Sequence, residues 1–170
     1  MKFMEKLKKA KKDNKGFSLV ELIIVIAIMA ILVGIVGTQV IPYINRSKEA
    51  KDFQIVNSFS TAAMTAYGSN AEAVEKEAAG GTVTVYVYGT TTNTTDVQKK
   101  LAKEIQELTY DGSASGFSLG SVFGSTEGQK ITDIVIKYDF NDRKITTQAV
   151  KTGATAGTSE NVFDKIESKM

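Results

Sequence analysis

A nearly unbroken apolar run from Phe17 to Gly37 constrains this chain more than any other feature. The run is 21 residues long, and its only polar side chains are Ser18 and Glu21. With about 1.5 Å of rise per residue, a helix of this length just spans a hydrocarbon core of roughly 30 Å. The run therefore predicts a membrane-spanning helix close to the N-terminus.

Lysines precede the run directly. Residues 1–16 hold seven lysines and two acidic residues, a net charge of +5, whereas the rest of the chain holds 14 basic and 17 acidic residues. By the positive-inside rule, residues 1–16 stay in the cytoplasm and the C-terminal part is exported. The basic excess thus belongs to the first residues alone, and we predict no nucleic-acid-binding surface.

The run is compatible with three kinds of segment. A secretory signal peptide has a shorter apolar region and a small-x-small cleavage site, and no Ala-x-Ala follows the run before Pro42. A plain membrane anchor explains the length and the lysines, but it leaves Glu21 unexplained. A carboxylate in a membrane helix costs about 3 kcal/mol on insertion scales and usually has a partner. Cleavage before Phe17 would supply one, because it creates an α-amino cation four residues away on the same helix face. This pair can close within one chain or between neighbouring chains.

The residues around this position form a specific motif. The stretch Lys15-Gly16-Phe17-Ser18-Leu19-Val20-Glu21-Leu22 resembles the processing site of type IV prepilins and the related pseudopilins. The resemblance implies that prepilin peptidase cuts between Gly16 and Phe17 and N-methylates Phe17. It also implies that Glu21 of an incoming subunit engages the amino terminus of its neighbour in the filament.

From this resemblance we expect a structural subunit of a type IV pilus, a cell-surface fimbrium that acts in adhesion, motility or secretion. The precursor would sit as a single-pass protein in the cytoplasmic membrane and then polymerise with itself. Its partners would be the peptidase, a membrane platform protein and an assembly ATPase. The absence of Cys is compatible with a Gram-positive type of system. The alternatives are a pseudopilin of a type II secretion system and a membrane-tethered receptor or enzyme.

We expect three segments: a cytoplasmic leader (1–16), a transmembrane and assembly half of the N-terminal helix (17–44), and an exported head (45–170). The helix should end near Tyr67, at Gly68-Ser69-Asn70. Gly34, Gly37 and Pro42 interrupt good helix-forming sequence, and they predict either a kink or a segment that melts locally when subunits pack. Beyond Asn45–Asp52, which is mainly polar, a stripe with helical spacing predicts a face packed on the head. It comprises Phe53, Val56, Phe59 or Ser60, Ala63, and Ala66 or Tyr67.

The head is predicted to be α+β, with the long helix packed on an antiparallel sheet as in the type IV pilin fold. Periodicity and turn residues predict helices at 71–79 and 96–108 and strands at 82–88, 131–140 and 144–150, the last two joined by a turn at 141–143. A short strand is predicted at 117–119 and a flexible link at 151–159. A C-terminal helix should start at Ser159 and dock Val162, Phe163 and Ile166 on the head.

The composition removes most catalytic chemistries. The chain has no Cys and no His, which excludes disulfides, thiolate metal sites and Ser-His-Asp or Cys-His catalysis. Asp133, Asp139, Asn141 and Asp142 form an oxygen-rich group in sequence, but calcium needs six to eight oxygens and the EF-hand spacing is absent. Some pseudopilins do bind calcium near their C-terminus. We favour an ordinary polar hairpin here, and we predict no metal, no cofactor, no catalytic residue and no enzymatic activity.

Overall fold

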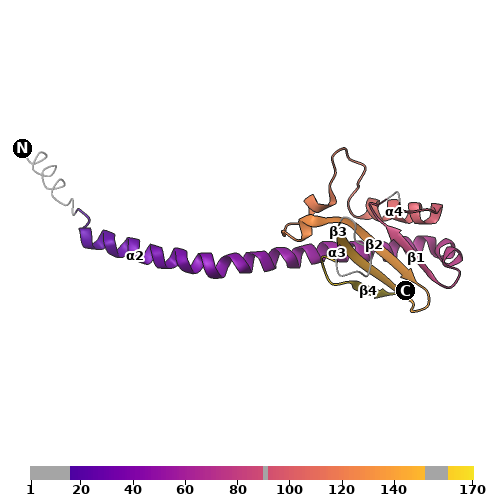
Figure 1. The fold of residues 1–170 in the computed structure, drawn as a ribbon, viewed down its shortest axis with the longest axis horizontal. Coiled ribbons are helices and arrows are strands. Elements are labelled where there is room, and N and C mark those ends of the chain that lie inside the picture. The colour runs from indigo at the N-terminus through magenta and orange to yellow at the C-terminus, as the bar shows by residue number, and fades with distance from the viewer. Residues whose placement is uncertain (1–15, 90–91, 152–160) are drawn as a thin grey trace, which may run out of the picture. The chain divides into compact units, whose positions relative to one another are not determined.

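The computed structural model describes residues 16–89, 92–151 and 161–170. The chain divides into two compact units, with the boundary between Ile44 and Asn45, and each unit is described by itself. A long helix runs from Leu19 to Ala78 in three consecutive elements: α2 (Leu19–Ile35), a π-helical segment η1 (Val36–Val40) and α3 (Ile41–Ala78) (Figure 1).

The long helix continues past the predicted end near Tyr67. Asn70 has non-helical dihedral angles (φ −128°, ψ 19°), but the helix resumes after it. The Asn70 side-chain amide donates to the Ala66 carbonyl (2.9 Å) and to a Glu104 carboxylate oxygen (2.7 Å). The stop signal at Gly68–Asn70 therefore produces a local distortion, because these bonds hold the chain in place across it. The predicted helix at 71–79 is the last part of α3.

The C-terminal part of α3 carries the predicted buried stripe. Val56, Phe59, Ser60, Ala63 and Ala66 are all buried, as their spacing predicts. The prediction is wrong for Phe53, which is 36% exposed, because the preceding residue Asp52 occupies the buried face at this turn of the helix. The structure adds the buried residues Asp52, Ala62, Asn70 and Val74 to this face.

Four antiparallel strands form one sheet in the order β1-β2-β3-β4: β1 (Thr82–Tyr86), β2 (Ile131–Asp139), β3 (Lys144–Lys151) and β4 (Ile166–Lys169). The predicted turn at 141–143 connects β2 and β3. The prediction of strand 82–88 is two residues too long. The Val87 N–H still donates to the Ile134 carbonyl of β2 (3.0 Å), but the next two N–H groups, those of Tyr88 and Gly89, bind the Asp133 side chain.

The prediction of a C-terminal helix is wrong. Ile166 lies in the edge strand β4, which pairs with β3, and the expected N-cap Ser159 lies outside the described residues, as does most of the predicted link at 151–159. The three apolar residues do dock on the head, since Val162, Phe163 and Ile166 all pack against its core. A short segment with apolar residues at irregular spacing did not distinguish a helix from an edge strand.

The helix α4 (Asp96–Leu108) has the predicted bounds. It begins with a capping box, in which the Thr95 side chain accepts from the Gln98 N–H (3.2 Å) and the Gln98 side chain accepts from the Thr95 N–H (3.1 Å). The predicted strand at 117–119 is wrong. Phe117 and Ser118 have no regular secondary structure, and Leu119 begins a short 3₁₀ helix, η2 (Leu119–Val122). A second 3₁₀ helix, η3 (Gly128–Lys130), precedes β2.

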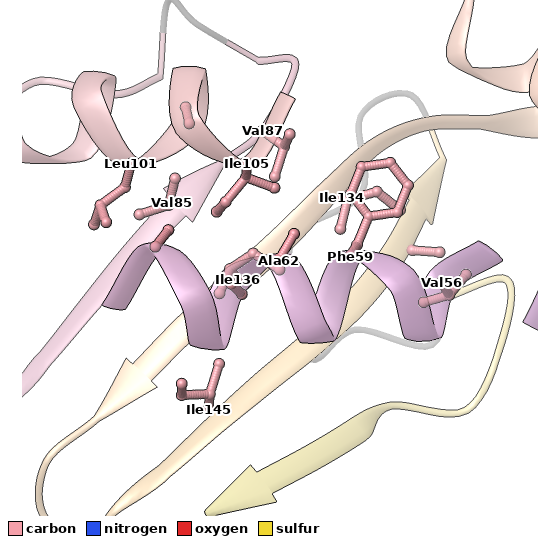
Figure 2. Close-up of a cluster of buried hydrophobic side chains, with 14 of the residues drawn as sticks. Val56, Phe59, Ala62, Val85, Val87, Leu101, Ile105, Ile134, Ile136 and Ile145 are labelled. Atoms are coloured by element: carbon pink, nitrogen blue, oxygen red, sulfur yellow. The ribbon is translucent and has the colours of Figure 1, made fainter. Parts of the chain in front are cut away.

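One hydrophobic cluster unites these elements. Figure 2 shows side chains from α3, α4 and the sheet converging, among them Val56, Phe59, Leu101, Ile105, Ile134 and Ile136. The Tyr138 hydroxyl also donates to the Ala63 carbonyl of α3 (3.1 Å). The architecture is therefore the predicted α+β arrangement of one long N-terminal helix and an antiparallel sheet.

Candidate processing and assembly site

The predicted cleavage site lies just before α2. Gly16, Phe17 and Ser18 have no regular secondary structure, and α2 begins at Leu19. The Phe17 residue is 88% exposed. A peptide bond in a non-helical, exposed segment is accessible to a peptidase, whereas a bond inside a helix must first be unwound. The Gly16–Phe17 bond is thus placed where cleavage requires no loss of helical hydrogen bonds.

A capping box defines where the helix starts. Ser18 has extended dihedral angles (φ −66°, ψ 140°), and its hydroxyl accepts a hydrogen bond from the Val20 N–H at 3.4 Å. The Glu21 carboxylate reaches back and accepts from the Ser18 N–H at 2.9 Å. A negative side chain in the first turn also interacts favourably with the helix dipole. Glu21 therefore has a local partner in the uncut chain.

The α-amine with which Glu21 was predicted to pair does not exist until Phe17 becomes the N-terminus. The capping bond shows that the carboxylate already points toward the residues at the cut. The partner of Glu21 in a filament stays a prediction.

The helix surface that follows Glu21 is apolar, and no other described residue of this unit packs against it. All residues of α2 are exposed, and none is buried. No charged residue occurs between Glu21 and Arg46. Among the described residues, the helix beginning at Leu19 is long and apolar enough to cross a membrane. A surface of this kind requires lipid or protein neighbours.

The segment with Gly34, Gly37 and Pro42 is helical throughout, but its hydrogen bonding changes. The π-helical turn Val36–Val40 ends two residues before Pro42. A wider turn here suits a proline, whose ring clashes with the carbonyl of the preceding turn in an ordinary α-helix. The Thr38 hydroxyl donates to the carbonyls of Gly34 (3.1 Å) and Ile35 (3.4 Å). The π-turn was not predicted from the residue pattern, and local melting stays a prediction.

In the head, the predicted oxygen-rich group is not one cluster. Asp133 binds the N–H groups of Tyr88 and Gly89. Asp139, at the other end of β2, accepts from the N–H groups of Asn141 (3.1 Å) and Asp142 (3.2 Å) in the turn. Within the part of the chain that the structure describes, no group of three or more acidic residues is arranged to hold a metal ion. The grouping in sequence was misleading because a strand separates Asp133 from the turn.

Two buried carboxylates have main-chain partners. Asp52 is 1% exposed, and its oxygens accept from the N–H groups of Gly124 and Ser125, both at 2.8 Å. Asp133 accepts from Tyr88, Gly89 and Ile134 at 2.8, 3.0 and 2.8 Å. Burial raises the pKa of Asp133 to about 6, against the opposing effect of these N–H groups. Asp52 was predicted to lie in a mainly polar segment, and only its four-residue step before the buried Val56 hinted at an inward position.

Comparison with known proteins supports the assignment of the N-terminal segment. Residues 11–37 match the model of the prokaryotic N-terminal methylation motif. No curated protein and no solved structure shows significant similarity to the chain. The matched segment contains Gly16, Phe17, Ser18 and Glu21. The chain thus carries a prokaryotic N-terminal methylation motif at the start of its apolar helix, which indicates a prepilin of the type IV pilin-like kind.

Proposed function

We propose that this chain is the structural subunit of a type IV pilus. Glu21 carries the proposal, because it is a lone carboxylate at the start of an uncharged helix, five residues after the Gly16–Phe17 bond. A plain anchor gains only a helix cap from such a residue, against the cost of a charge in the membrane. A subunit that polymerises through its helix does gain from it, because the carboxylate can pair with a neighbour's amine.

Processing is the first step of the proposed pathway. The precursor is held in the cytoplasmic membrane by α2, with residues 1–16 on the cytoplasmic side. Prepilin peptidase cuts between Gly16 and Phe17 and methylates the new amine. The mature subunit then has 154 residues of the original 170. The exposure of Phe17 and the non-helical backbone of residues 16–18 support this site.

Assembly is the second step, and it requires a fixed register between subunits. A platform protein and an assembly ATPase draw subunits from the bilayer into a homopolymer. The apolar surface of residues 22–41 favours contact between helices but offers few features that select one register. A buried pair between Glu21 and the Phe17 amine of a neighbour selects it, because every other register leaves an uncompensated charge. Measured buried pairs lose roughly 3 to 5 kcal/mol when one partner is left alone.

The exposed face of α3 is also suited to helix packing. No charged residue occurs between Asp52 and Glu72. The exposed hydroxyls of Ser58, Thr61 and Thr65 donate to carbonyls of their own helix at 2.6, 3.2 and 3.0 Å. Because these hydroxyls already have a hydrogen-bond partner in their own helix, their burial against a neighbouring helix carries only a small desolvation penalty. This face therefore supports the proposal that α3, as well as the membrane-spanning part of the helix, packs against other subunits in a filament.

A pseudopilin of a type II secretion system would have the same motif, so the experiment must separate the two. The gene is deleted and then restored in its host, and surface filaments are counted by immunogold electron microscopy at native expression. Loss and recovery of labelled filaments support the pilus subunit. Normal filaments together with a loss of secreted proteins from the medium would contradict it and favour the pseudopilin.

A further inference from the structure

A cavity of about 490 Å³ lies on the head where the end of α3 meets the β2–β3 turn. It is lined by Tyr67, Glu75, Gly80, Phe140, Arg143 and Met170. Its size is within the range of small-ligand sites. None of these residues belongs to the proposed processing and assembly site.

Two aromatic rings line the cavity, and one of them is held in place. The Tyr67 ring lies 6.0 Å from the Tyr138 ring and 6.1 Å from the Phe140 ring, measured between centroids. The Tyr67 hydroxyl donates to Glu75 Oε1 at 3.0 Å. This fixes the orientation of Tyr67 and leaves the second Glu75 carboxylate oxygen, Oε2, as an available acceptor.

Arg143 has an unusual backbone for its residue type. Its φ is +49°, in the left-handed region that favours glycine or asparagine. A glycine would adopt this backbone with less strain, whereas the arginine contributes to the lining of the cavity. In a non-glycine residue such an outlier points to a role for the side chain.

Among the described residues, the guanidinium of Arg143 forms no ion pair with a carboxylate. The neighbouring carboxylate, Asp142, pairs with Lys144 at 3.1 Å. The Met170 N–H donates to the Arg143 carbonyl at 3.1 Å, which fixes the residue at the edge of the cavity. Arg143 thus supplies several free donors in a defined place.

From these groups we infer that the cavity binds a neutral saccharide. Aromatic faces suit the apolar C–H face of a pyranose ring, while Arg143 donates to hydroxyl oxygens and Glu75 accepts from hydroxyl hydrogens. One positive and one negative side chain leave the lining balanced, which favours a neutral ligand over an acidic one. A single shallow site of this kind would bind a saccharide weakly. A polymer that presents one site per subunit would bind a multivalent glycan with higher avidity. Only that last step rests on the proposed function.

The test uses the full-length chain in micelles of a detergent without a sugar head group. Saturation-transfer NMR is recorded with glucose, galactose and N-acetylglucosamine at millimolar concentrations, and N-acetylneuraminic acid is the acidic comparison. Arg143→Gly removes the side chain and suits the left-handed backbone, so this variant is expected to fold. Glu75→Ala removes the acceptor. Lys76→Ala, next to Glu75 and outside the lining, is the matched charge-removal control.

We expect at least one neutral sugar to bind, with an affinity about tenfold weaker or worse in Arg143→Gly and Glu75→Ala, because a hydrogen bond to a charged group is lost. Lys76→Ala should bind as the unaltered chain does. Absence of binding by all the neutral sugars, equal binding by Arg143→Gly, or a preference for the acidic sugar would each overturn the inference.

Discussion

The carboxylate of Glu21 accepts a hydrogen bond from the main-chain N–H of Ser18 at 2.9 Å. Glu21 therefore has two separable properties, since it caps its own helix and it carries the only charge of the apolar segment. A glutamine keeps the acceptor and loses the charge, whereas an alanine loses both. The two substitutions distinguish a role in capping from a role in pairing.

We predict that Glu21→Ala and Glu21→Gln are both inserted and cleaved normally but assemble poorly, because charge pairing is lost in both. Glu21→Asp, shorter by one methylene, should retain part of the yield. Filaments are sheared from cells and quantified by immunoblot, with the membrane pool measured alongside. Wild-type filament yield from Glu21→Gln would show that capping, and not charge, is what Glu21 contributes.

Removal of the membrane half should leave a soluble head. A fragment of residues 45–170 starts at the boundary between the two compact units and omits the exposed apolar helix surface. We predict a folded monomer by circular dichroism and light scattering. Tight oligomers of the fragment would mean that the head itself drives assembly.

Asp52 should be a strong determinant of head stability. Its buried carboxylate accepts from Gly124 and Ser125, each at 2.8 Å. In Asp52→Asn, an amide NH₂ replaces one acceptor and faces an N–H donor. We expect a loss of about 2 to 4 kcal/mol in the free energy of unfolding, because a buried donor is left unsatisfied. Denaturant unfolding of the full-length chain in micelles measures it. Glu49→Gln is the exposed control with the same charge change, and an equal effect of the two substitutions would contradict the assigned role.

The stability of the head should depend on pH through Asp133. Burial raises its pKa to about 6, so the folded state binds a proton more tightly than the unfolded chain. The tighter binding of the proton adds to the free energy of unfolding. This addition is fully present below the ordinary carboxylate pKa and is lost as pH rises through about 6. A shift of this size corresponds to at most about 3 kcal/mol. Unfolding free energies measured from pH 4 to pH 7 should fall less in Asp133→Asn than in the unaltered chain. Parallel curves would contradict the prediction.

Local signals predicted the elements that depend on local chemistry. The bounds of α4 follow from its period and from the Thr95 capping box. The processing motif is contiguous in sequence, which is why it was identifiable without a structure. The buried stripe of α3 follows from helical spacing in the same way.

Long-range partners decide what the sequence could not predict. β4 is a strand because it pairs with β3, and α3 continues past Asn70 because Glu104 binds the Asn70 amide. The burial of Asp52 depends on N–H groups more than seventy positions away. The cavity at Arg143 combines residues from α3, the β2–β3 turn and the last residue, Met170. No local pattern carries such pairings.

Mass spectrometry of sheared surface filaments tests the central claim most directly. The account predicts a chain of 154 residues that begins with N-methylated Phe17 and lacks residues 1–16. Filaments built from chains that still carry residues 1–16, or that begin at any residue other than Phe17, would contradict it.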